Sequence, residues 1–277
     1  MSGITFTFDL ENHRNDQEGA DRLIRNTHEV LEFLAEHQIT ATVFAVGELV
    51  RDHRPLLRTI AEAGHELALH SYRHTPLTAE QPDQFRQGIA QDMEGLAEIS
   101  GAAVKGFRAP VFSLTESSLW AIEVLGELGF SYSSSVLPLK HPLFGFPNVP
   151  RTPFRWPNGM LELPVPVASF FGLTIPYLGG IYARYVPLNR VLNRLQHQPA
   201  EAVLWSYLHP YDIDTSEGYF QFPGTSHLMS LLLWRRRGDT LNRIQRIMSA
   251  NGTPAPTLIE RVSALSKIEL PEFSKAA

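Results

Sequence analysis

Apolar residues recur with two different periods along the first half of the chain. Short apolar runs, such as Ile-Thr-Phe-Thr-Phe at 4–8, are typical of buried strands, whereas apolar residues four apart, such as Phe85, Ile89 and Met93, are typical of helices. This pattern predicts strands at 4–8, 41–46, 66–69, 104–107 and 130–136, with helices between them at 20–36, 56–60, 79–99 and 119–125.

Strand and helix therefore alternate five times with short connections. This order predicts a parallel sheet covered by helices. No Gly-x-Gly-x-x-Gly turn follows the first strand, which favours closure into a barrel over an open dinucleotide-binding sheet. We expect an α/β protein in which the carboxyl ends of the strands carry the site.

The second half of the chain is less regular. Residues 138–160 are rich in proline without the glycine and serine of a flexible linker, so we expect a structured loop. Prolines also indicate that 161–167 is an edge strand. Further on, the pattern predicts a strand at 203–208 and helices at 228–237 and 239–248.

The chain has 277 residues, a length at which α/β barrels form one domain. We therefore expect a single domain over 1–277, with a core that carries the motifs at 3–215 and a helical extension at 225–270. The amino terminus has no basic and apolar leader pattern, which leads us to expect a cytoplasmic protein.

Charge and cysteine content restrict the chemistry. The formal net charge is −5 and the only basic block is 235–237, so nucleic acid is not an expected partner. That block could contact anionic lipid, or it could be a solvated helix end. The chain has no cysteine, so a metal ion would be held by histidine, aspartate or glutamate.

Two histidines follow the third predicted strand. His70 and His74 are four residues apart, and in a helical turn both imidazoles would lie on one face and could hold one metal ion. Taken alone, the pair could equally be two unrelated surface or capping histidines. The metal interpretation depends on Asp9 and Glu11, which follow the first strand and would be costly to bury without a partner.

Two other strand ends carry polar side chains, Arg108 after the fourth strand and His209 after the strand at 203–208. Two carboxylates and two imidazoles suit a divalent ion with an open position for water. A spare carboxylate can deprotonate that water, and a separate histidine can protonate a leaving group. Together these groups are sufficient for metal-assisted hydrolysis of an amide or ester.

These motifs, taken in order, resemble those of the polysaccharide deacetylases, the NodB-homology group or carbohydrate esterase family 4. The resemblance covers roughly residues 3–215. Other stretches look like the subgroup linked to exopolysaccharide and exosortase loci, namely 130–136, 179–182 and 209–214. The motifs that carry the family resemblance are Thr7-Phe8-Asp9, His70-Ser71-x-x-His74, Arg108-x-Pro110 and Leu208-His209.

The resemblance implies a distorted (β/α) barrel, a divalent metal ion that is often zinc, and hydrolysis of N-acetyl groups on amino sugars of a polysaccharide or oligosaccharide. By the same resemblance, His70 and His74 are metal ligands and Asp9 is the catalytic base. Arg108 would hold that base, and His209 would be the general acid.

The chain departs from the family's pattern at two positions. Leu10 stands where the family has a second, metal-binding aspartate, and Glu11 is the natural substitute as third ligand. Ser133 stands where the family tends to have an aspartate. The expected substrate-binding residues, taken from the same motifs, are Pro110, Tyr182 and Tyr211; aromatic residues in this region could also belong to the core.

Two alternatives to a deacetylase remain open. One is another amidase on the same scaffold, such as a deformylase of lipid-linked amino sugars or a ureide hydrolase. The other is a sugar-binding pseudoenzyme, which the changes at Leu10 and Ser133 favour slightly. No serine or cysteine nucleophile elbow is present, and the 70–74 motif lacks the glutamate of a zinc-peptidase helix.

Overall fold

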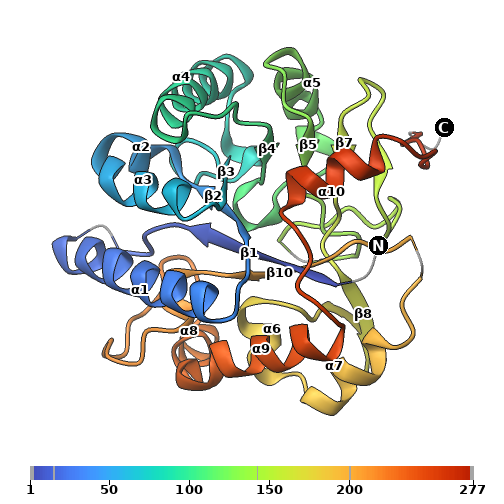
Figure 1. The fold of residues 1–277 in the computed structure, drawn as a ribbon. Helices are drawn as coiled ribbons and strands as arrows, with labels where there is room; N and C mark the ends of the chain where they lie inside the picture. The colour runs from blue at the N-terminus through green and yellow to red at the C-terminus, as the bar shows by residue number, and fades with distance from the viewer. Residues whose placement is uncertain (1–2, 15, 142, 200, 275–277) are drawn as a thin grey trace.

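A curled sheet with helices outside it forms the centre of the protein (Figure 1). The computed structural model describes residues 3–14, 16–141, 143–199 and 201–274. The strands are ordered β10-β1-β2-β3-β4-β5-β7-β6 across this sheet. Their bounds are β1 Ile4–Leu10, β2 Ala41–Ala45, β3 Glu66–Leu69, β4 Gly106–Phe107, β5 Tyr132–Ser133, β6 Phe154–Arg155, β7 Leu161–Glu162 and β10 Leu204–Leu208.

All neighbouring strands of this sheet are parallel except β6, which pairs antiparallel with β7. β10 and β6 form its two ends, so the sheet is a half barrel, and the expected distorted barrel is confirmed. A separate antiparallel hairpin, β8 (Val167–Phe170) and β9 (Leu173–Pro176), was not predicted.

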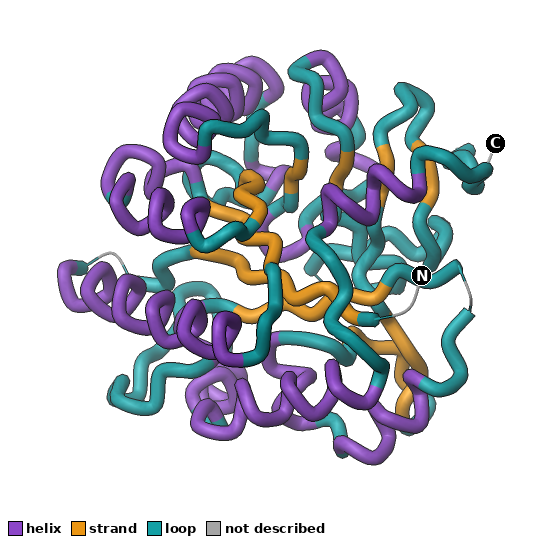
Figure 2. The backbone as a smooth tube through the Cα atoms, in the orientation of Figure 1, coloured by secondary structure: helices purple, strands orange, loops and turns teal. Residues whose placement is uncertain are grey.

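Helices surround the sheet, as the tube drawing shows (Figure 2). None of the helices in the described part of the chain is long and apolar enough to cross a membrane. Their bounds are α1 Gln17–Glu36, α2 Gly47–Asp52, α3 Arg54–Glu62, α4 Pro82–Ser100, α5 Trp120–Glu127, α6 Gly180–Tyr185, α7 Leu188–Leu195, α8 His227–Trp234, α9 Thr240–Ala250 and α10 Leu258–Leu265.

Helix α1 shows how the sequence sets these elements. The side chain of Asp16 accepts a hydrogen bond from the backbone N–H of Gly19 at 2.7 Å and caps the helix. Leu23, Val30 and Leu34 lie on one face and are buried in the core. The predicted helix at 20–36 therefore forms, and it starts three residues earlier because of the cap.

The helical extension folds back onto the start of the chain. The guanidinium of Arg261 in α10 donates a hydrogen bond to the carbonyl oxygen of Gly3 at 2.7 Å, and the N–H of Leu258 donates one to Thr42 at 2.8 Å. Helix α10 therefore covers the amino-terminal ends of the strands, and the opposite edge of the sheet is left for the site. The single-domain organisation over 1–277 stays a prediction.

Two local expectations were wrong. Residues 161–167 are not an edge strand, because β7 lies between β5 and β6. The N–H groups of Leu163 and Val165 bond to β5 and the residues after it, while Pro164 and Pro166 alternate with them and need no donor on that side.

The second concerns 70–74, which is a loop and not a helical turn. Ser71 and His74 have positive φ angles of 63° and 54°, which a right-handed helix does not allow.

Candidate active site

The predicted site residues meet at the carboxyl edge of the sheet. Glu11, His70 and Arg108 each come directly after the last residue of β1, β3 and β4, and His209 comes directly after β10. Parallel strands point their carboxyl ends to one edge, so these residues from distant parts of the sequence are brought together.

Glu11, His70 and His74 form a group that could hold a metal ion. One ligand atom from each lies within 4.8 Å of the others. Nε2 of His70 is 3.5 Å from Oε2 of Glu11, and Nε2 of His74 contacts the same oxygen. The predicted third ligand is therefore in place in the group, one residue beyond Leu10, whose side chain is buried in the core.

The chemistry of these donors fits a divalent cation. Nδ1 of His70 is 2.9 Å from the carbonyl oxygen of Arg108; it must donate to that acceptor, which leaves a lone pair on Nε2. Oε2 of Glu11 is buried and receives no hydrogen bond in the described part of the chain. A buried carboxylate oxygen facing imidazole nitrogens is the environment that a bound cation would satisfy.

Glu11 stays ionised in this setting. Burial would raise the pKa of its carboxyl group, but the nearby imidazoles of His74, His209 and His70 outweigh burial and hold the pKa well below its usual value. A metal ligand must be deprotonated at neutral pH, and Glu11 meets that requirement.

Asp9 has a different partner. Its Oδ1 accepts a hydrogen bond from Nη1 of Arg108 at 2.5 Å, and both side chains are buried. Arg108 also donates to the hydroxyl of Thr7 at 2.8 Å. The guanidinium lies 3.9 Å from the ring centroid of Phe44 and 4.2 Å from that of Trp205, so packing as well as charge fixes it.

His209 faces both carboxylates. Its Nε2 is 3.9 Å from Oδ2 of Asp9 and 3.9 Å from Oε1 of Glu11. Burial disfavours the charged imidazolium, but the charges of Glu11, Asp212 and Asp9 outweigh it and raise the pKa of His209 to about 9. In this setting His209 carries a proton at neutral pH, which is what a general acid needs.

The sequence did not indicate Asp212 and Arg184. Asp212 holds the Nδ1 side of His209, and Arg184 holds Asp212. Oδ2 of Asp212 is 2.8 Å from Nδ1 of His209, and its Oδ1 is 3.0 Å from a guanidinium nitrogen of Arg184. Asp212 also accepts the backbone N–H of His209, so the turn at 209–212 is capped. A carboxylate three residues after a strand-end histidine has capping spacing and could have been recognised.

The three expected substrate-binding residues lie near the site, but their side chains are buried or partly buried. Tyr211 is buried, with its ring stacked on His209 at 4.7 Å and an interplanar angle of 7°. Pro110 is buried in the turn after β4, and Tyr182 packs partly buried against the core. Their contact with substrate stays a prediction.

A buried carboxylate from another strand, that of Glu162, lies beside Ser133. Glu162 of β7 accepts hydrogen bonds from the N–H groups of Ser135 and Val136 at 2.7 and 2.9 Å and from the indole of Trp156 at 3.1 Å. The hydroxyl of Ser133 donates to that of Ser135. Burial raises the pKa of Glu162. Glu162 is thus a buried carboxylate beside Ser133, bonded to the backbone of the next residues and to Trp156.

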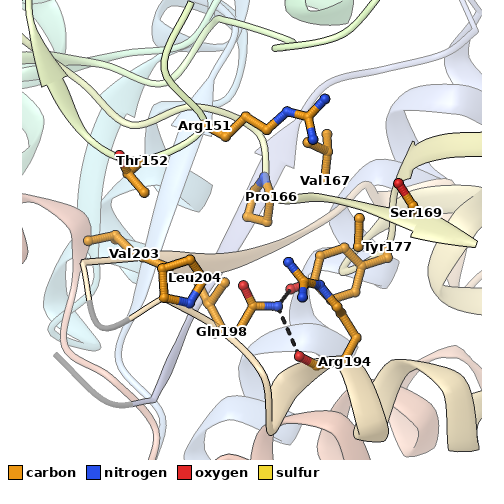
Figure 3. A pocket seen from close by; sticks show the side chains of 13 residues that line it. Arg151, Thr152, Pro166, Val167, Ser169, Tyr177, Arg194, Gln198, Val203 and Leu204 are labelled. Carbon is orange, nitrogen blue, oxygen red and sulfur yellow. Dashed lines mark hydrogen bonds between the residues drawn. The ribbon is translucent and has the colours of Figure 1, made fainter.

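A small cavity of about 260 Å³ opens beside Glu11 and His74. A second cavity, of about 310 Å³, is lined by Arg151, Arg194 and Tyr177 (Figure 3). It includes Leu204, the first residue of β10, and therefore lies at the end of that strand away from His209. Of the site residues described above, Glu11 and His74 line the first cavity.

Comparison with known proteins agrees with this geometry. Residues 3–132 match the family described as polysaccharide deacetylase, and residues 134–252 match a domain of unknown function, DUF3473. A peptidoglycan-N-acetylglucosamine deacetylase from Bacillus cereus is 33% identical over 98 residues, which are 35% of this chain and 36% of that protein. A chitooligosaccharide deacetylase from Rhizobium leguminosarum is 35% identical over 101 residues, 36% of this chain and 42% of that protein. The chain thus matches well under half the length of these curated relatives.

Solved structures share the fold over nearly the whole chain. A Mycobacterium smegmatis protein assigned to the polysaccharide deacetylases has a TM-score of 0.63 at 19% identity and covers 99% of this chain and 94% of its own. PuuE allantoinase has a TM-score of 0.62 at 15% identity, covering 95% and 89%. A family 4 pseudoenzyme from Bacillus anthracis has a TM-score of 0.52 at 12% identity, covering 95% and 66%. Residues 3–132 are therefore similar to the polysaccharide deacetylase family, and residues 134–252 are similar to the DUF3473 family.

Proposed function

We propose that the protein is a metal-dependent hydrolase that removes N-acetyl groups from amino sugars of a polysaccharide, an oligosaccharide or a lipid-linked precursor. The observation that carries the proposal is the metal-binding group of Glu11, His70 and His74 next to the Asp9–Arg108 pair and His209. The names of the relatives that act on N-acetylglucosamine polymers support this substrate class. The resemblance to the family subgroup linked to exopolysaccharide loci supports a role in polymer biosynthesis.

Glu11, His70 and His74 would hold the divalent ion, for which we propose zinc. When bound, such an ion polarises a carbonyl group and lowers the pKa of water. Asp9 is the base: Arg108 occupies its Oδ1, so Oδ2 is the oxygen free to take the proton from the attacking water.

His209 completes the reaction as the acid. Asp212 accepts the hydrogen bond of Nδ1, which directs the Nε2–H toward Asp9 and Glu11, beside which the amide nitrogen would lie. His209 donates that proton to the departing amine as the tetrahedral intermediate collapses. The products are acetate and a free amino sugar, and the acetamide C–N bond is the bond broken.

The proposal is tested by measuring acetate release from N-acetylglucosamine oligomers with the zinc-loaded protein. Release of acetate that disappears on chelation is the expected result. Release of formate from an N-formyl sugar, without acetate from the N-acetyl sugar, would instead indicate a deformylase. Because an allantoinase shares this fold, hydrolysis of a ureide substrate is measured as a third assay.

A sugar-binding pseudoenzyme is the second candidate. The observation in its favour is Leu10, which replaces the family's second aspartate. Glycan binding by the metal-loaded protein, with no acetate released over many hours, would support this alternative and overturn the first.

A further inference from the structure

Helix α8 has its polar and apolar faces reversed relative to an ordinary surface helix. Its sequence is His-Leu-Met-Ser-Leu-Leu-Leu-Trp, and among these residues, all of them described, only Ser230 is buried. The Ser230 hydroxyl accepts the N–H of Phe222 at 3.1 Å. Leu228 is 66% exposed and Met229 43%. The apolar residues 231–234 are half-buried, and an apolar helix exposed to this degree is typical of an interaction site.

The surroundings of α8 are basic and aromatic. Arg235 and Arg236 follow the helix and are both exposed. Residues 218–236 contain no aspartate or glutamate. Glu217, on the amino-terminal side of this segment, is buried and paired with Arg237, and the first exposed acid that follows it is Asp239, three residues after Arg236, so the exposed charge at 235–239 is still net positive. Tyr219 is 40% exposed at one end.

Trp234 is the last residue of the helix, but its ring lies 5.9 Å from that of Tyr219, and its indole donates to the carbonyl of Glu217 at 2.9 Å. A tyrosine–tryptophan pair beside an apolar helix, with two exposed arginines after it, is an arrangement typical of a helix that lies in a membrane interface.

The helix is also joined to the candidate active site. Nη1 of Arg184 donates to the carbonyl oxygens of Leu233 and Arg235 at 2.9 and 3.0 Å. The other end of the same guanidinium pairs with Asp212, which holds His209. Figure 1 places α8 on the side of the molecule toward which the arrow of β1 points, the side that carries the site.

We propose that α8, together with Arg235 and Arg236, docks the protein on an anionic lipid surface. The exposed leucines enter the boundary between headgroups and acyl chains, and the arginines contact lipid phosphates. A second copy of the chain fits this face less well, because a two-fold contact would bring both pairs of arginines together. If the proposed function holds, docking through α8 presents the active site to amino sugars carried on lipid; this part of the inference rests on that function.

The test is sedimentation of the full-length protein with vesicles of phosphatidylcholine, alone or mixed with phosphatidylglycerol. Binding to the anionic vesicles, weakened by added salt, is expected. Leu228→Gln should reduce binding about tenfold, because most of a leucine side chain no longer leaves water. Leu173→Gln, at a residue 68% exposed in the β8–β9 hairpin, is the matched control and should bind like the original.

The arginines are tested separately. Replacing both Arg235 and Arg236 by glutamine should weaken binding to anionic vesicles by about 25-fold, at about fivefold for each charge. Absence of anionic vesicle binding, or equal loss in the Leu228 and Leu173 variants, would overturn the proposal. So would a Leu228 variant that changes only the oligomeric state, since that result would assign α8 to contact between copies.

Acetate release from soluble oligomers is measured in parallel. Vesicle binding without acetate release would refute the proposed function and leave docking standing. Acetate release without vesicle binding would refute docking alone.

Discussion

At the scale of single residues, the two carboxylates after β1 are separated by their partners. Asp9 and Glu11 project from the same side of an extended segment, as alternation along a strand requires. Glu11 faces two imidazoles, whereas Asp9 faces the guanidinium of Arg108. Position in the sequence makes them equivalent, and their neighbours give them different chemistry.

This difference predicts opposite phenotypes. Asp9→Asn should keep the metal and lose turnover, because the base is removed while the ligand group is intact. Glu11→Gln should weaken metal binding and be partly rescued by excess metal. Metal titrations of both variants by calorimetry check this. If Asp9→Asn loses the metal and Glu11→Gln keeps it, the two roles must be exchanged.

His209 should matter for rate and not for metal content. His209→Ala should lower the rate by roughly 10²–10⁴-fold, the usual contribution of a positioned acid or base. Metal content measured on the same preparation should be unchanged, and a variant that loses both would show that His209 is a ligand.

Asp212→Asn tests the support of His209. Asp212 contributes to the raised pKa of His209, so its removal lowers that pKa. His209 would then lose its proton at a lower pH, and the alkaline fall in rate should begin earlier. A pH–rate profile that is merely scaled down would argue against this coupling.

At the scale of elements, the 70–74 loop is held by helix α2. The N–H groups of Gly47 and Glu48 donate to the carbonyl oxygens of Ser71 and Tyr72 at 2.9 and 3.1 Å. A Cβ on residue 47 would lie 1.7 Å from a carboxylate oxygen of Asp92, so glycine is needed where α2 meets α4. The positions of His70 and His74 therefore depend on packing between helices as well as on their own spacing.

Asp92 at this contact should destabilise the fold at neutral pH. Its Oδ2 is buried without a hydrogen bond among the described residues, and burial raises the pKa to about 7. The free-energy cost of burying the ionised carboxylate is complete above pH 7. It decreases as the pH falls from 7 toward 4, because the folded state binds the proton at a higher pH than the unfolded state does. Asp92→Asn should raise the free energy of unfolding at pH 8 by about 2 to 4 kcal/mol.

Denaturant unfolding at pH 8 and pH 5 measures this effect, which should shrink at the lower pH. Asp83→Asn, at an exposed position on the same helix, is the control and should change little. A gain at pH 5 equal to that at pH 8 would show that charge is not the cause.

At the scale of the whole molecule, a buried ionic network joins α1 to the segment after β10. Oδ2 of Asp214 accepts hydrogen bonds from Arg22, Arg25 and Asn26 at 3.0 to 3.1 Å. Glu217 is 2.8 Å from His13 and 2.6 Å from Arg237. These contacts fix the segment that follows His209 against the first helix.

The network should make stability sensitive to acid. Burial would raise the pKa of Glu217, but hydrogen bonds from His13 and Arg237 outweigh it and lower the pKa to about 2; the pKa of Asp214 is lowered for similar reasons. The stabilisation is present above the unfolded pKa near 4 and is lost as pH falls toward 2. Asp214→Asn should lower the melting temperature at pH 7 and flatten this acid decline. A melting curve series from pH 7 to 2 checks both effects.

Much of the fold and the candidate metal group could be predicted from the sequence, because both depend on short periods. Alternation placed β1, β2 and β3 within one or two residues, and strand ends located Glu11 and His70. The inner position of β7 could not be predicted, since its pairing with β5 is non-local. The β8–β9 hairpin was missed although its two strands are separated by only two residues.

Asp212 and Arg184 show a similar limit within the site. The two residues pair across a long stretch of sequence, and no local pattern links an arginine in α6 to a turn after β10. The strand predicted at 104–107 was two residues too long at its start, since β4 covers only Gly106–Phe107.

An open sheet has no last pair of strands to set how tightly it bends, so its radius must be fixed in another way. Arg108 starts at the end of β4 and reaches Asp9 on β1, crossing two intervening strands inside the curve. Its own carbonyl meanwhile holds His70 on β3. Arg108 thus sets the distance across the curved sheet from β4 to β1. A shorter side chain at this position would change the distances between the metal-binding atoms of Glu11, His70 and His74, although Arg108 is not a ligand itself.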